Sequence, residues 1–151
     1  MQDYEPMVRE CYAPIIEKYK FQFAKFADEQ FFLIGNGFAL WVFADKREAY
    51  GDIGYVSVDK KGVIRAYSLM DINENRFTPQ DRECYGDPTT ADGRIESDFK
   101  VDCTGLMNRC NDILSGDKQW LEGYEDEGTK NYNISEFLRP YFEEQGLSIS
   151  G

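Results

Sequence analysis

Two apolar runs, residues 31–34 and 38–43, are separated only by Gly35-Asn36-Gly37. Asn-Gly is the dipeptide that a tight type I′ hairpin prefers, so we expect two antiparallel strands with Asn36 and Gly37 in the turn. Side chains alternate along a strand, which makes both faces of this hairpin apolar. Such a hairpin must be covered on both sides, by helices of this chain or by another chain. One face carries Phe31, Leu33, Phe38, Leu40 and Val42, and the other carries Phe32, Ile34, Ala39, Trp41 and Phe43.

A second hairpin is expected around residues 59–62, because Gly62 can take the left-handed conformation that closes such a turn without strain. Tyr and Arg are enriched at interface hot spots, so Tyr55, Arg65 and Tyr67 form a candidate partner-binding face. The alternative is that these tyrosines only fit a pleated surface exposed to solvent. The register gives a core face of Val56, Val58, Ile64 and Ala66 and an opposite face of Tyr55, Ser57, Arg65 and Tyr67.

Helical periodicity flanks the expected sheet. Apolar residues recur every three or four positions over residues 4–19, with a kink or a break expected at Pro14. A second apolar stripe, over residues 99–114, predicts a helix whose start is capped by Ser97 or Asp98. Both helices are expected to cover the sheet.

The rest of the chain completes the expected fold. Residues 71–94 are rich in Asp, Asn, Pro and Gly and predict a long loop, and Asn133 is expected to cap a last helix. The chain of 151 residues is long enough for one domain with a real core. We therefore expect a single α+β domain over residues 1–151, with an antiparallel meander of about four to six strands, an N-terminal helix and a helical C-terminal third.

The chain has no histidine, which removes the usual general base of hydrolytic triads and the commonest metal ligand. Residues 71–82 open like a calcium-binding loop, but Arg76 and Arg82 occupy the positions of its glycine and its last glutamate. We expect no catalytic residue, no metal and no cofactor. The cysteines form no Cys-x-x-Cys pair and indicate core residues in a reducing compartment: Cys11, Cys84, Cys103 and Cys110.

The formal net charge is −11, and it is unevenly placed. Residues 1–80 carry twelve acids and ten bases, whereas residues 81–151 carry sixteen acids and seven bases. Such a surface repels nucleic acid and anionic membranes and attracts a basic protein, although acidity also serves solubility alone. The partner-binding patch is expected at four acids with two aromatic anchors beside them: Glu122, Glu125, Asp126 and Glu127, with Trp120 and Tyr124.

In size, acidity and lack of catalytic residues, the chain resembles the small immunity proteins of bacterial toxin systems, many of which neutralise basic nucleases. The resemblance concerns the general organisation of the whole chain and implies a protein-binding inhibitor of a basic partner. No secretory signal or membrane span is evident in the sequence, so a soluble, cytoplasmic protein is expected.

Three alternatives remain open. The central hairpin can form a homodimer by covering its apolar face with a second copy. It can instead line a small-molecule pocket with Phe31, Phe32, Trp41 and Phe43. A carboxylate-based enzyme would draw on acids of the expected long loop: Asp81, Glu83, Asp87 and Asp92.

Overall fold

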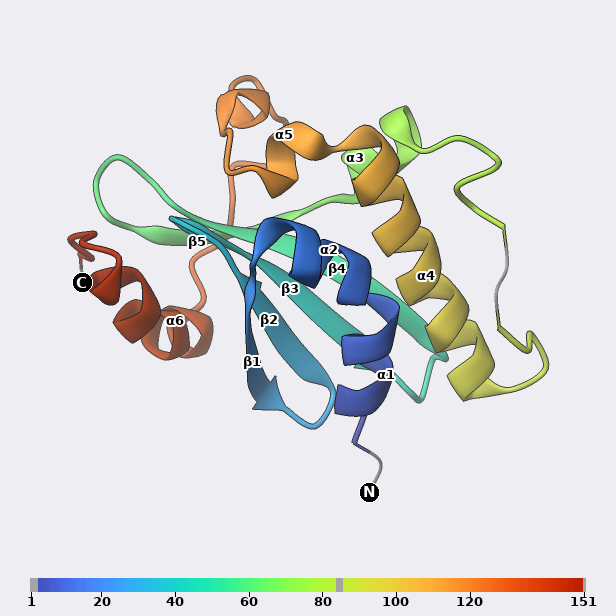
Figure 1. Ribbon diagram of the computed structural model, residues 1–151. Helices are drawn as coiled ribbons and strands as arrows, with labels where there is room; N and C mark the ends of the chain where they lie inside the picture. The colour runs from blue at the N-terminus through green and yellow to red at the C-terminus, as the bar shows by residue number, and fades with distance from the viewer. Residues whose placement is uncertain (1–2, 84–85, 151) are drawn as a thin grey trace.

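Five antiparallel strands form one meandering sheet in the computed structural model, which describes residues 3–83 and 86–150 (Figure 1). Strands that are neighbours in the sheet are also neighbours in sequence. The predicted α+β class, with a meander sheet between an N-terminal helical part and a helical C-terminal third, is confirmed. The strands are β1 (Gln22–Ala27), β2 (Gln30–Ile34), β3 (Phe38–Asp45), β4 (Tyr50–Val58) and β5 (Ile64–Ser68).

One face of the sheet is covered by α1 (Glu5–Cys11), α2 (Ala13–Tyr19) and α4 (Ala91–Arg109), which lie in front of it in Figure 1. The break expected at Pro14 is present: α1 ends before it, and Pro14 lies in the first turn of α2, where its missing N–H leaves no bond unmade. This face buries the side chains predicted for it: Phe31, Leu33, Phe38, Leu40 and Val42.

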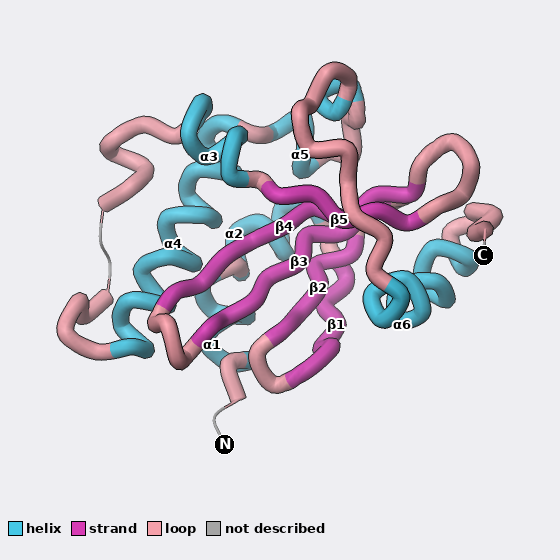
Figure 2. Tube along the Cα trace, turned by 180° about the vertical axis from the view of Figure 1, so that it is seen from behind, coloured by secondary structure: helices cyan, strands magenta, loops and turns pink. Residues whose placement is uncertain are grey.

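The other face is covered by α6 (Tyr132–Glu144), which lies over the end of the sheet that carries the β2–β3 and β4–β5 turns (Figure 2). Gln145 fastens this end, because its Oε1 accepts from the Gly37 amide at 2.8 Å and its Nε2 donates to the Gly35 carbonyl at 2.8 Å. Trp41 stays half-buried beyond the helix. The core on this side contains Ala24, Phe32, Ile34, Ala39, Val56, Ile64, Ile134, Leu138 and Phe142.

The β2–β3 turn differs from the prediction. A type I′ turn needs positive φ at both central residues, but only Gly37 has it, with φ of 80°, and Asn36 does not. Contacts from distant parts of the chain hold the turn, since the Lys118 ammonium donates to the Gly37 carbonyl at 2.7 Å. The second turn has Gly62 in the expected left-handed conformation, with φ of 79°.

The segment 71–94 is not the long loop expected from its composition. It is largely helical at both ends: α3 (Met70–Arg76) begins it, and α4 starts at Ala91. Thr90 caps α4 by accepting from the Gly93 amide at 2.9 Å. The predicted caps Ser97 and Asp98 therefore lie inside the helix.

The last helix begins two residues earlier than a cap on Asn133 would allow. Asn131 is the cap, and its Oδ1 accepts from the Ile134 amide at 3.1 Å. Between α4 and α6 the chain forms the short helices α5 (Asn111–Leu114) and η1 (Gln119–Leu121).

Cys11, Cys103 and Cys110 are buried with free thiols, as core residues should be, and Cys84 lies outside the described residues. None of the helices in the described ranges is long and apolar enough to cross a membrane.

Candidate functional site

The four acids predicted to bind a partner lie on one segment, residues 122–129, which we call the acidic loop. Figure 2 shows this part of the chain running past β5 towards α6. Reciprocal backbone hydrogen bonds of 2.8 and 2.9 Å between Ala66 and Thr129 attach it to the edge of the sheet. The acidic loop is thus a fixed part of the β5 edge.

The acids of this loop divide into two kinds. Glu122, Glu125 and Glu127 are exposed and make no ion pair with any base in the described part of the chain. Asp126 is half-buried and accepts from the backbone amides of Ser68 and Gly128, each at 2.8 Å. Asp126 therefore holds the loop in place, while the three glutamates carry uncompensated charge.

The aromatic residues predicted as anchors pack mainly against one another. Tyr55 is fully buried, so it belongs to the core and cannot contact a partner, contrary to its candidate role. Its ring meets Trp120 edge to face, with 4.8 Å between centroids, and Trp120 meets Tyr124 in the same way at 5.2 Å. Both of these rings are half-buried. The Tyr124 hydroxyl donates to the Ser68 carbonyl at 2.6 Å.

The two faces proposed from the sequence meet in space. Tyr67 lies beside Tyr55, with 6.3 Å between ring centroids, and touches the acidic loop at Gly128, where an added Cβ would come within 2.7 Å of the ring. Arg65 is half-buried and pairs with Asp59 at 3.2 Å. Trp120 and Tyr67 thus pack against the acidic loop, at Tyr124 and at Gly128 respectively.

A cavity of about 390 Å³ opens next to this loop, on the face of the sheet that α6 covers only in part. Its floor is aromatic, since the rings of Trp41 and Phe43 lie 5.0 Å apart and are both half-buried. Its rim carries the carboxylates of Asp52 and Asp126. We call it the sheet groove; it is lined by Trp41, Phe43, Asp52, Ile53, Gly54, Ala66, Tyr67, Ser68, Asp126, Thr129 and Asn131.

The chemistry of the sheet groove suits a cation on an apolar stem. Aromatic faces attract an ammonium or guanidinium group, and carboxylates at the rim add a charge-assisted partner. Gln30 fixes the indole of Trp41, because its Oε1 accepts from the indole Nε1 at 3.1 Å. A lysine or arginine side chain of a partner would therefore find both a stacking surface and two counter-charges here.

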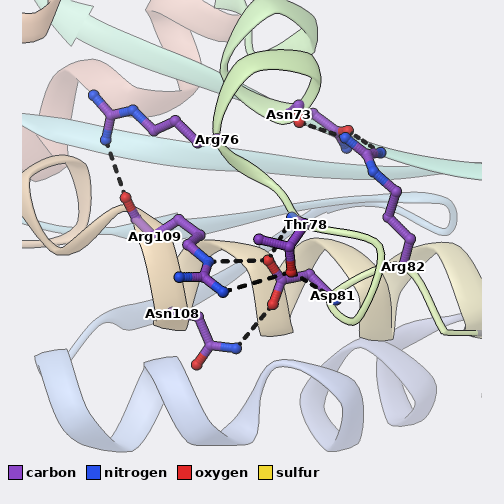
Figure 3. Close-up of polar contacts among 7 residues, drawn as sticks. All are labelled: Asn73, Arg76, Thr78, Asp81, Arg82, Asn108 and Arg109. Atoms are coloured by element: carbon purple, nitrogen blue, oxygen red, sulfur yellow. Dashed lines mark hydrogen bonds and ion pairs between the residues drawn. The ribbon is translucent and has the colours of Figure 1, made fainter.

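The carboxylates considered for catalysis have local structural partners. Asp81 is buried, and its carboxylate accepts from the Thr78 amide at 2.8 Å, from Asn108 at 3.0 Å and from Arg109 at 3.2 Å (Figure 3). Burial opposes its ionisation, but these hydrogen bonds outweigh that effect and lower the pKa of Asp81 to about 2. Asp81 therefore stays ionised and anchors the segment after α3 onto α4.

Two of the other three acids considered for catalysis also have local partners, and the third is exposed. Asp87 accepts from the Thr89 amide at 2.9 Å, Asp92 accepts from the Tyr4 hydroxyl at 2.9 Å, and Glu83 is exposed. None of these acids lines the sheet groove. Over the described ranges, no group of three or more Asp, Glu or Cys side chains is arranged to hold a metal ion.

Sequence reasoning found the aromatic floor only in part, and it missed the rim. Trp41 and Phe43 were expected to line a pocket together with Phe31 and Phe32, but the last two are fully buried. Asp52 gave no signal, since an acid near the start of a strand is common on solvated surfaces. Its role depends on where α6 stops covering the sheet.

Comparison of the chain with protein-family models, with curated proteins and with solved structures finds no match in any of the three.

Proposed function

We propose that this protein is a non-enzymatic binding module that masks a basic protein, in the manner of an immunity protein that inhibits a toxin such as a nuclease. The observation that carries the proposal is the combination of an aromatic floor and a carboxylate rim in the sheet groove. Three glutamates of the adjacent acidic loop make no ion pair with any base that the structure describes. The free thiols of the three described cysteines suit a reducing compartment such as a bacterial cytoplasm.

Binding in this proposal has two stages. The negative field of the acidic loop attracts a basic partner and raises the association rate. A lysine or arginine of the partner then enters the sheet groove, where Trp41 covers its aliphatic stem and Asp52 or Asp126 pairs with its charge. Few anchors are needed, because most interfaces depend on a small number of central residues.

The first test identifies the partner and then measures the purified pair. The tagged protein is isolated from its native cells, and any protein recovered at equal stoichiometry is identified and produced separately. We expect a basic protein whose affinity falls by about 30-fold or more when Trp41→Ala removes the central aromatic anchor. The control is Tyr132→Ala, since Tyr132 is 73% exposed and lies outside the sheet groove. An acidic partner, or equal losses for the two variants, would contradict the proposal.

The second test concerns steering. Glu122, Glu125 and Glu127 are changed together to Gln, which leaves the structural Asp126 in place. We expect the association rate to fall by about tenfold at low salt, with a weaker salt dependence and a nearly unchanged dissociation rate. Glu143 and Glu144, exposed on α6, are changed to Gln as the control. A loss confined to the dissociation rate would argue against steering.

A small-molecule binder remains the second candidate, because the sheet groove has a volume of about 390 Å³, within the range of ligand sites. A screen of neutral aromatic compounds by thermal shift separates the two functions. A specific ligand raises the melting temperature in proportion to the logarithm of its concentration, and Trp41→Ala abolishes the effect.

A further inference from the structure

A second cavity, of about 320 Å³, lies where α3, α4 and the start of β4 meet. Its walls are mainly apolar and include Leu69, Ile72, Phe77 and Leu106. Gly105 allows this packing, since an added Cβ would come within 2.3 Å of the Phe77 ring. We call this cavity the α3–α4 pocket.

The α3–α4 pocket contains a buried carboxyl group that has few partners. Asp102 is only 7% exposed, and its sole hydrogen bond among the described residues is a long one, 3.5 Å, from the side-chain amide of Asn73 to Oδ1. Buried carboxylates in proteins normally accept several hydrogen bonds or pair with a cation. The second oxygen of Asp102, Oδ2, has no hydrogen-bond donor in the described part of the chain.

The charges around Asp102 are mostly negative. Asp52 on β4 and Glu74 on α3 line the same pocket, and Asp98 lies one turn before Asp102 on α4. Burial, and then the charges of Asp52 and Asp98, raise the pKa of Asp102 well above its ordinary value. The neutral, protonated acid is the form that these surroundings favour.

The one basic residue in the lining of the pocket, Arg82, binds Asn73 and makes no hydrogen bond to Asp102 among the described residues. Figure 3 shows the Arg82 guanidinium bound to Asn73, whose backbone carbonyl and side-chain oxygen both accept from it. Arg82 makes no ion pair within the described ranges, although its charge partly offsets the effect of the acids on Asp102. Two further titratable groups lie near Asp102: Tyr12, between α1 and α2, and Cys103 of α4. Burial, then the charge of Asp102, raises the pKa of Tyr12, and burial raises the pKa of Cys103.

We propose that the α3–α4 pocket binds the ammonium group of an alkylamine, with the nitrogen at Asp102 and the alkyl stem against Leu69, Ile72 and Leu106. On binding, the Asp102 carboxylic acid releases its proton to solvent, and its carboxylate pairs with the ammonium group. The amine is either a free small molecule or the lysine side chain of a bound polypeptide, since both present the same group. The inference does not rest on the proposed function, because Asp102 does not line the sheet groove.

Three probes with the same alkyl chain test the charge preference: hexylammonium, 1-hexanol and hexanoate, titrated into the full chain at pH 7 and followed by calorimetry and NMR. We expect saturable binding of hexylammonium, at least tenfold weaker binding of hexanol, and none of hexanoate. The NMR signal of the Asn73 side-chain amide should shift with hexylammonium. Equal binding of all three probes, or shifts confined to other residues, would overturn the proposal.

Two further measurements test the role of Asp102: one uses a variant, and the other uses the unmodified protein, whose fold is unchanged. Asp102→Asn should weaken hexylammonium binding at least tenfold, while Asp87→Asn, a change at an exposed acid outside the pocket, should leave it unchanged. In the unmodified protein the affinity should rise from pH 5 to pH 8, because fewer molecules then have a proton to release from Asp102. An affinity that is flat or falls over this range would refute the assignment.

A last experiment distinguishes a free amine from the lysine side chain of a polypeptide. The peptide acetyl-Gly-Lys-Gly-amide presents the same ammonium group on a polypeptide. Competition with hexylammonium would identify a lysine side chain as an acceptable ligand, and binding of hexylammonium alone would identify a free amine.

Discussion

Asp102 illustrates how a single residue can tie stability to pH. The folded state raises its pKa above the ordinary value of 3.8, so the folded state holds a proton that the unfolded chain releases. The free energy of unfolding should therefore decline as pH rises from about 4 towards the folded-state pKa. Asp102→Asn removes this titration, so the variant should gain stability relative to the unmodified protein as pH rises from 4 to 8. Urea unfolding at several pH values measures the difference, with Asp87→Asn as control; a constant difference would contradict it.

Asp81 has the opposite effect on the pH dependence of stability. Its pKa is lowered from 3.8 to about 2, so it stabilises the fold above pH 4, and this contribution disappears as pH falls towards 2. Because one pKa unit corresponds to about 1.4 kcal/mol, Asp81→Asn should cost about 2 kcal/mol of unfolding free energy at neutral pH. Urea denaturation at pH 7 and pH 3 should show a smaller cost at the lower pH. Glu83→Gln, at an exposed neighbour, should have little effect.

At the scale of elements, α6 is joined to the sheet by apolar packing and by Gln145. That side chain bonds both Gly35 and Gly37, so Gln145→Ala should cost about 1–2 kcal/mol and speed hydrogen exchange in α6. Amides of α4 should keep their protection, because α4 covers the opposite face. Glu144→Ala, next to Gln145 and exposed, is the matched control. Equal exchange in both variants would show that packing alone holds α6.

The elements also show what sequence reasoning can reach. Alternation along a strand is a local property, so the two faces of the central hairpin followed from residues 31–43 alone. The geometry of its turn did not, because Gly37 is held by Gln145 and Lys118, which lie 108 and 81 positions away in the chain. Asp102 had a visible signal, since it lies three positions after Phe99 and four before Leu106, on the apolar side of α4. The boundary of the sheet groove depends on the position of α6, which no local pattern specifies.

At the scale of the whole molecule, the open part of the sheet disfavours pairing with a second copy. A two-fold dimer brings the same patch of each subunit together, so the rim acids Asp52 and Asp126 of both subunits would gather in one interface. Sedimentation at physiological salt should therefore give a monomer. If dimers form, they should strengthen when Asp52→Asn removes one of the opposing charges. A stable dimer that Trp41→Ala dissociates would instead support the covering of the central hairpin by another copy.

Asp52 lines both the sheet groove and the α3–α4 pocket. A cation bound in one cavity partly neutralises the Asp52 carboxylate. The attraction of Asp52 for a cation in the other cavity then becomes weaker. The two occupancies are therefore linked, and thermodynamics requires each to lower the affinity of the other by the same factor. A small amine would act on this protein as a competitor that never touches the surface for which it competes.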